Sequence, residues 1–315
     1  MFNMKMKITK FAALLLALVG MTSCYDDFIS DYPNPNMGFV LGKQVRTVVS
    51  TTNKIYVGVS IGGKREIDMN DWANFTLDET LLAGMSYKML PESYYTMDDP
   101  NTFRVRKSNL AVADVGISFT DEFYADPACL SNTYALPFRL LATSIPAEDA
   151  PHGAIRKGAE TAVVVVKYIS GYSGTYYRMG EVVETDANGW TYESEYRNGD
   201  LSTNAKVTLT TLGRDVLRCP GLADNPYGAL VLSLTQREGS EDCDVAVDVE
   251  GDGVVLVDAS AEYVKKGDHK LYSGDEDAPQ INLEYTYTYN GSEFSVSEVL
   301  VLRQYAEREL KVETF

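Results

Sequence analysis

Acidic side chains supply most of the groups in this 315-residue chain that could do chemistry. It carries 45 Asp and Glu against 28 Lys and Arg, which gives a formal net charge of −17. This excess argues against nucleic-acid binding, because attraction to phosphates needs a basic surface. The only histidines, His152 and His269, lie far apart, and there is no HExxH motif. We therefore expect neither a zinc hydrolase site nor a histidine-assisted serine nucleophile.

One acidic run, Asp248-Val249-Glu250, copies the end of the DxxDxDxE motif of chitinase-like hydrolases. Cys243 and Ala246 stand where that motif requires Asp, and a (β/α)8 barrel of about 250 residues does not fit after residue 170. The acids at 244, 248 and 250 alternate with valines, which is typical of the solvent face of a strand. We therefore expect no enzyme. A glycosidase with two acids on unrelated strands stays as the weaker alternative.

Calcium is the inorganic ligand that the acids would suit best, because Ca²⁺ prefers carboxylate oxygens. Two groups of acids qualify: Asp242, Asp244, Glu250 and Asp252 form one, and Asp275, Glu276 and Asp277 form the other. Neither has the 12-residue spacing of an EF-hand loop. We expect solvated charges and no cofactor, with calcium at residues 275–277 as the alternative.

Tyrosine is unusually frequent, with 21 Tyr against 11 Phe and 2 Trp. Aromatic rings stack on the C–H faces of sugars, and the tyrosine hydroxyl bonds to sugar hydroxyls. Trp190 follows Ala187-Asn188-Gly189, a turn signal that predicts a place at a barrel rim. The candidate glycan-binding residues are Trp190, Tyr172, Tyr177, Tyr192, Tyr196 and, in a separate loop, Trp72. Cross-strand packing is the alternative explanation for these rings, above all for Tyr176, Tyr192 and the alternating tyrosines 285, 287 and 289.

The first 23 residues predict a lipoprotein signal peptide. Three lysines precede an apolar run over residues 11–21, which is too short to span a membrane. Thr22-Ser23-Cys24 resembles a bacterial lipobox, although Met21 departs from the usual Leu. We expect acyl chains such as palmitate on Cys24 to anchor the mature chain in a lipid bilayer.

Residues 24–36 predict an acidic tether that contains two prolines. Its Asp26-Asp27 pair resembles the export signal of Bacteroidetes lipoproteins that are displayed on the outer face of the outer membrane. We therefore expect the protein at the outer membrane, facing the cell exterior. A plain solvated linker is the alternative explanation of these residues.

Three further cysteines, Cys129, Cys219 and Cys243, allow one internal disulfide at most. Cys219 and Cys243 are the nearer pair. Isolated buried thiols are the alternative that we favour slightly.

The mature chain shows the period-two alternation of strands, as in Lys54 to Ile61, Ala229 to Gln236 and Ile281 to Tyr289. Asn290-Gly291 predicts a tight hairpin turn, and Thr76-Leu77-Asp78-Glu79 predicts the capped start of one short helix that Gly84 ends. We predict an all-β chain with one domain over residues 37–169 and a second over residues 170–315.

Both domains resemble parts of Bacteroidetes surface lipoproteins of long-unknown function. The first shares the glycine-bearing Val59-Ser60-Ile61-Gly62-Gly63, Leu81-Leu82, Leu90-Pro91, Tyr94-Tyr95 and the segment from Tyr134 to Leu140. The second shares Ser173-Gly174-Thr175-Tyr176 and the segment from Tyr285 to Arg303. The resemblance implies an immunoglobulin-like β-sandwich with one short helix, followed by an antiparallel calycin-like barrel (lipocalin- or streptavidin-like) or a second sandwich.

That resemblance also implies association with SusC/SusD-type glycan uptake systems. We therefore expect a non-catalytic surface lipoprotein that binds glycan and supports polysaccharide uptake. A structural or adhesive protein with a protein or matrix ligand is the alternative.

Overall fold

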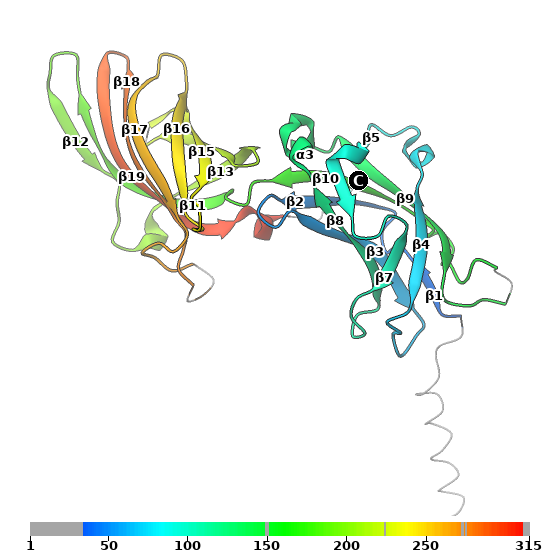
Figure 1. The fold of residues 1–315 in the computed structure, drawn as a ribbon. Helices are drawn as coiled ribbons and strands as arrows, with labels where there is room; N and C mark the ends of the chain where they lie inside the picture. Colours follow the sequence, from blue (N-terminus) through cyan, green and yellow to red (C-terminus); the bar gives the residue numbers. More distant parts are fainter. Residues whose placement is uncertain (1–33, 149–150, 224, 272–273, 275, 311–315) are drawn as a thin grey trace, which may run out of the picture.

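The structure is a computed structural model that describes residues 34–148, 151–223, 225–271, 274 and 276–310. Its strands form two sheets, and each sheet builds one domain (Figure 1). The first sheet ends at Ile169 and the second begins at Gly174. The predicted all-β fold class is confirmed. The predicted signal peptide, Cys24 and nearly all of the tether lie outside the described residues.

The N-terminal domain is one curved sheet that forms an open half-barrel (Figure 1). The main path runs β1-β3-β8-β7-β4-β9-β10-β2, with β5 and β6 as short additions. This differs in detail from the two-sheet sandwich that we expected, because β4 pairs with both β7 and β9 and so continues one sheet. The strands are β1 Asn36–Gly38, β2 Lys43–Val49, β3 Lys54–Gly62, β4 Trp72–Leu77, β5 Lys88–Met89, β6 Tyr95–Met97, β7 Thr102–Val105, β8 Val112–Phe119, β9 Tyr134–Thr143 and β10 Thr161–Ile169.

Strand β10 explains the apolar run at residues 162–166, because it is buried on both faces. Val164 and Val166 belong to the main core, whereas Val163 and Val165 pack with Leu82 in a smaller cluster. Short helical turns complete the domain: η1 Glu79–Leu82, η2 Glu92–Tyr94, α3 Asp121–Ala125 and η3 Pro127–Leu130.

The predicted short helix exists as the single 3-10 turn η1. Its N-cap is Asp78, whose carboxylate accepts a hydrogen bond from the Thr80 backbone N–H at 3.0 Å. Thr76, which the capping-box pattern favoured as the cap, still belongs to β4. Gly84 adopts a φ of 78° just beyond the turn, as a helix-ending glycine should.

The C-terminal domain is a closed eight-stranded antiparallel barrel with β12 as an extension. Closure comes from β11, which pairs with β19 on one edge and β13 on the other. The strands are β11 Gly174–Thr185, β12 Thr191–Glu195, β13 Ala205–Gly213, β14 Val216–Leu222, β15 Asn225–Gln236, β16 Cys243–Glu250, β17 Val255–Val264, β18 Gln280–Tyr289 and β19 Ser292–Tyr305, with the helical turns η4 Leu201–Thr203 and η5 Ala306–Glu309.

The barrel is closed near the first domain and open at its far end (Figure 1). Strand β13 covers only the first residues of β11, and β12 replaces it over Glu181–Thr185. On the other side, β16 pairs with β17 only over Cys243, Asp244 and Val245. The strands then diverge toward their turns, so the far half consists mainly of the sheet β12-β11-β19-β18-β17.

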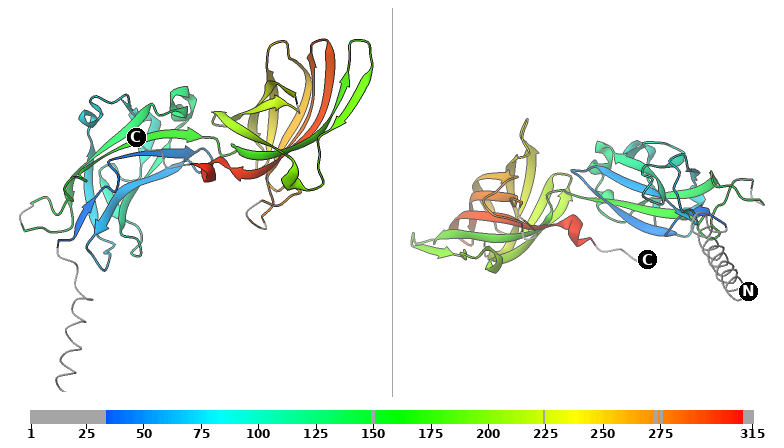
Figure 2. Two further views of the ribbon diagram at one scale, coloured as in Figure 1. Left: turned by 180° about the vertical axis from the view of Figure 1, so that it is seen from behind. Right: turned by 90° about the horizontal axis from the view of Figure 1, so that it is seen from below.

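The predicted hairpin at Asn290-Gly291 is confirmed. These two residues connect β18 to β19 with φ values of 50° and 84°, which suit a type I′ turn. The two domains lie end to end, and η5 brings the end of β19 back to the point where they meet (Figure 2). Within the described part of the chain, no helix is long and apolar enough to span a membrane.

Candidate functional site

The open end of the barrel carries a row of side chains on its inner face. The register of β12, β11, β19, β18 and β17 aligns one residue from each strand at the same level. These residues are Tyr192, Glu184, Phe294, Tyr287 and Leu256. Because facing residues in antiparallel strands share a side of the sheet, all five point to the inner side. We call this row, with Trp190, Tyr227 and Tyr289, the mouth face.

Aromatic rings on the mouth face stack in two groups. Tyr287 lies between Tyr285 and Phe294, with ring centroids 6.1 Å and 4.8 Å away. Tyr289 stacks with Tyr227 at 5.8 Å, and Tyr227 is 62% exposed. Strands β16 and β17 separate β15 from β18 in the sheet, so the second stack spans the mouth. Tyr285 and Tyr287 are buried in these stacks, whereas Tyr227 is exposed and Tyr289 and Phe294 are partly exposed.

Trp190 lies at the tip of the β11–β12 hairpin and is 69% exposed. The Asp186 carboxylate fixes this turn by accepting hydrogen bonds from the backbone N–H groups of Asn188 and Trp190, at 2.8 Å and 2.9 Å. The bond to Trp190, together with the weaker effects of the neighbouring turn residues, outweighs desolvation and holds the pKa of Asp186 below its usual value. Trp190 directly precedes β12, in which Tyr192 is also exposed. The turn therefore presents an aromatic side chain on a rigid loop.

A small pocket of about 430 Å³ opens beside this turn. It is lined by Asp186, Tyr289, the Asn290-Gly291 turn and Ser292. The mouth face thus combines exposed rings with carboxylate, hydroxyl and backbone groups that can exchange hydrogen bonds.

A buried ion pair lies below the aromatic layer, inside the barrel. Arg178 Nε is 3.1 Å from Glu298 Oε2, and the two side chains are 8% and 0% exposed. Arg178 also donates hydrogen bonds to the carbonyl oxygens of Pro220 and Ala223, at 3.0 Å and 2.8 Å. Burial lowers the pKa of Arg178, but the Glu298 carboxylate and smaller contributions from Cys219, Tyr285 and Tyr196 together outweigh this effect and hold the arginine pKa above its usual value. The pair therefore ties β11 and β19 to the β14–β15 turn.

Tyr196 connects this ion pair to the mouth. Its hydroxyl donates a hydrogen bond to Glu298 Oε2 at 2.9 Å, and the ring is half-buried. Tyr285 contacts the same region, since its hydroxyl accepts a hydrogen bond from the backbone N–H of Ala223, whose carbonyl oxygen accepts from Arg178. These tyrosines support the floor of the mouth face.

The structure separates the aromatic residues that the sequence grouped. Trp190 and Tyr192 lie exposed at the mouth, whereas Tyr177 is buried at the closed end, as is Tyr176. Tyr172 lies near the first domain, where its ring meets Tyr263 edge to face at 5.1 Å. Trp72 begins β4 in the N-terminal domain. These positions do not form one cluster, and only Trp190, Tyr192 and Tyr196 face the open end.

Sequence reasoning missed Tyr227 and Phe294 as site residues. Tyr227 follows Asn225-Pro226, and its exposure depends on the irregular start of β15 next to Gly228, whose φ is 101°. Phe294 continues the apolar alternation of β19, which predicts that its side chain faces the barrel interior. The alternation does not predict that Phe294 pairs with Tyr287 of β18. The tyrosines at 285 and 287 are core residues, as the packing alternative had it.

The candidate acids are engaged in ordinary surface contacts. Asp248 and Glu250 lie exposed on β16, and Glu250 Oε2 accepts a hydrogen bond from Arg218 Nε at 2.9 Å. Asp277 pairs with Lys270, while Asp275 lies outside the described residues. Across the described ranges, no group of three or more His, Cys, Asp or Glu side chains is arranged to hold a metal ion.

The structure has Cys219 and Cys243 as free, buried thiols, which is the alternative that we favoured from the sequence over a disulfide. Cys219 Sγ accepts a hydrogen bond from Arg178 at 2.8 Å, whereas Cys243 Sγ donates one to the Tyr172 hydroxyl at 3.4 Å. The two thiols have different partners, and β15 lies between their strands. Cys129 is likewise free and buried.

Comparison with known proteins adds information on the fold. Residues 27–147 match a family model that is described as an N-terminal domain. A Bacteroides ovatus protein of unknown function is similar in structure over 90% of this chain and 99% of its own, with 21% sequence identity and a TM-score of 0.67. An auxiliary nutrient binding protein from Bacteroides thetaiotaomicron aligns over 83% of this chain and 91% of its own, with 14% identity and a TM-score of 0.40. No curated protein matches the chain.

The B. ovatus likeness establishes a shared fold, and it agrees with the resemblance to two-domain Bacteroidetes proteins. The second structural likeness has too low a TM-score to carry an argument about this chain.

Proposed function

We propose that this protein is a non-catalytic, lipid-anchored surface protein that binds glycan at the mouth face of its barrel. The observation that carries the proposal is the combination of exposed rings on fixed elements: Trp190, Tyr192 and Tyr227. Aromatic side chains on rigid elements lose little entropy on binding and offer flat apolar faces. Glu184 and the Asp186 turn lie beside the rings and offer acceptors for sugar hydroxyls.

The anchoring part of the proposal rests on the sequence. Acylation of Cys24 would hold the protein at the outer membrane, with its body facing the cell exterior. In this role, the protein would bind polysaccharide at the cell surface and support a SusC/SusD-type uptake complex. No cofactor is needed for such binding, and calcium at residues 275–277 stays an untested alternative.

Affinity electrophoresis in gels that contain plant, host or fungal polysaccharides tests the binding role. We expect at least one polysaccharide to retard the protein. W190A should relieve that retardation, with an affinity loss of about tenfold or more, because truncating a tryptophan that binding buries at the centre of an interface costs about 2 kcal/mol. The matched control is W72A, which removes the other tryptophan from the N-terminal domain and should leave the retardation unchanged.

Two outcomes would replace the proposal. If no polysaccharide retards the protein, the ligand is a protein or matrix component and the role is structural or adhesive. Release of reducing sugar from the same panel would instead indicate a glycosidase.

A further inference from the structure

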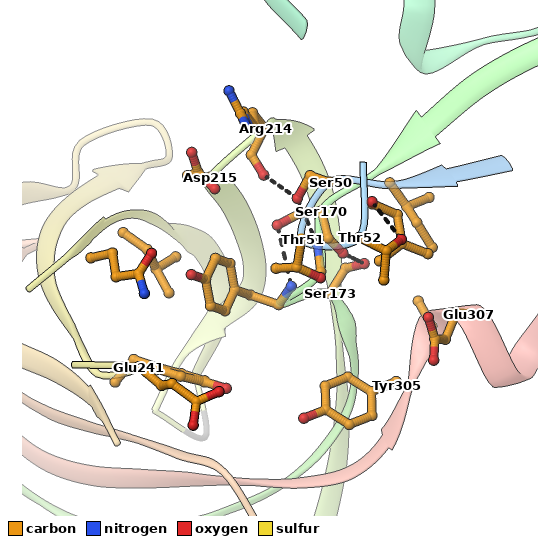
Figure 3. A pocket seen from close by; sticks show the side chains of 18 of the residues that line it. Ser50, Thr51, Thr52, Ser170, Ser173, Arg214, Asp215, Glu241, Tyr305 and Glu307 are labelled. Atoms are coloured by element: carbon orange, nitrogen blue, oxygen red, sulfur yellow. Dashed lines mark hydrogen bonds between the residues drawn. The ribbon is translucent and has the colours of Figure 1, made fainter. Parts of the chain in front are cut away.

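A second, larger pocket lies where the two domains meet (Figure 3). Its volume is about 840 Å³, within the range of small-molecule sites, which often form at domain interfaces. We call it the junction pocket. It is lined by residues of both domains, among them Ser50, Thr51, Tyr172, Ser173, Asp215 and Tyr305.

The walls of the junction pocket are fixed by hydrogen bonds between the domains. Ser50 Oγ donates to the Arg214 carbonyl oxygen at 3.2 Å and accepts from the Gly171 backbone N–H at 3.0 Å. The Ser170 backbone N–H donates to Thr211 Oγ1 at 3.0 Å. These contacts hold the β2–β3 turn of the first domain against the β13–β14 turn of the barrel. A ligand would therefore meet a largely preformed site.

The side chain of Arg214 strengthens the same contact between the domains. Its guanidinium donates to Asp121 Oδ1 at 2.6 Å and lies over the Tyr124 ring, 4.6 Å from the centroid. Both partners belong to α3 of the first domain. The arginine side chain is thus engaged away from its neighbour Asp215.

Asp215 is the unusual group in this pocket. It is half-buried, and none of the described residues forms a hydrogen bond or ion pair with its carboxylate. Burial raises the pKa of Asp215 above its usual value, and Arg214 offsets that effect only in part. Its charge in turn contributes to the raised pKa of Tyr172, after burial and the Cys243 contact. The Asp215 carboxylate oxygens keep contact with solvent, so a ligand with a suitable donor would replace water at this acceptor.

The rest of the lining defines the ligand. Hydroxyls of Ser50, Thr51 and Ser173 line one side, and the rings of Tyr172 and Tyr305 line another. Four acids line the pocket, Asp215, Glu241, Glu276 and Glu307, against the two cations Arg214 and Lys265. Lys265 Nζ already donates to the Tyr305 hydroxyl at 3.3 Å. Hydroxyls and rings suit a sugar, whereas the acidic surplus disfavours an anionic one.

We propose that the junction pocket binds a short saccharide without negative charge, one of whose hydroxyl or amino groups donates a hydrogen bond to Asp215. The site is separate from the mouth face, so the proposal does not depend on the function proposed above. Because both domains form its walls, an occupied pocket should also stabilise their contact.

Calorimetric titration of the protein with three trisaccharides tests this proposal. The probes are chitotriose, which is uncharged, its de-N-acetylated triamine, and trigalacturonic acid, which is anionic. All titrations use the W190A/Y192A background, so that mouth binding does not contribute. We expect the first two probes to bind and the acid to bind at least tenfold more weakly than either.

D215N supplies the decisive comparison. It should weaken triamine binding by about tenfold or more, since a hydrogen bond between two charged groups is stronger than one to a neutral amide oxygen. The matched control is D252N, which changes an exposed acid at the far turn and should leave binding unaltered. A melting curve of D215N checks that it is folded. The proposal is overturned if neither uncharged nor amino probe binds, if the anionic probe binds as well as they do, or if D215N binds like wild type.

Discussion

Replacing Arg178 with Met should destabilise the barrel far more than replacing an exposed arginine. Arg178 and Glu298 are 8% and 0% exposed, so removing the guanidinium leaves a carboxylate in the barrel interior without its counter-charge. Removing one partner of such a buried pair costs about 3–5 kcal/mol. The carbonyl oxygens of Pro220 and Ala223 lose their donor in the same change. We therefore expect a loss of about 4 kcal/mol in the free energy of unfolding of this domain.

Chemical denaturation followed by far-ultraviolet circular dichroism measures this loss as a shift in the unfolding transition of the second domain. The matched control is R218M, which breaks the partly exposed Arg218–Glu250 pair and should cost at most about 1 kcal/mol.

At acid pH, the difference in free energy of unfolding between R178M and the parent protein should become smaller. In R178M the Glu298 carboxylate lacks the Arg178 charge, so its protonation as the pH falls would remove a negative charge from the interior and lessen the penalty. If the free energy of unfolding falls no more in R178M than in R218M, the buried Arg178–Glu298 pair does not stabilise the barrel as we infer.

Three further predictions follow from single residues. In a C24S form, unfolded protein should show three reactive thiols with Ellman's reagent, and a single thiol would instead indicate the Cys219–Cys243 disulfide. Native protein should react slowly, because burial raises the pKa of Cys129 and of Cys219 to about 12 and shields Cys243. D215N should raise the melting temperature at neutral pH, because a carboxyl whose pKa is raised in the folded state costs stability once it ionises. This gain in melting temperature should vanish below the ordinary Asp pKa of 3.8, where the carboxyl is protonated in both states. A gain that persists there would contradict the effect of burial. C24S should release the protein from the membrane fraction of cells, and retention there would argue against acylation as the anchor.

Local signals in the sequence predicted local structure well. Asn290-Gly291 predicted its hairpin because both residues tolerate the positive φ that the turn requires. The apolar run at residues 162–166 predicted a buried strand, and β10 is buried on both faces. The capping box located η1 but placed the cap two residues early, because the strand pairing of Thr76 with Arg139 extends β4 to Leu77.

Long-range pairing could not be read from the sequence. Barrel closure joins β11 to β19, whose residues are more than a hundred positions apart, and alternation alone does not name the partner. The same register assembles the row of the mouth face, so the sequence around Phe294 does not show that this ring lies in the candidate site. Tyr172 and Tyr177 lie fewer than 20 residues before Trp190 in the sequence. Strand β11 nevertheless separates them in space, because it runs from the closed end of the barrel to the open end.

Fluorescence of Trp190 offers the most direct test of glycan binding at the mouth face. The measurement is a titration of the W72F protein with the polysaccharide that retards it in affinity gels, repeated with Y192A and with Y227A. Binding at the mouth should shift and change Trp190 emission in a saturable way, and either tyrosine substitution should weaken the affinity about tenfold. An unchanged emission spectrum under conditions where the polysaccharide is bound would contradict the account and place the glycan elsewhere on the protein.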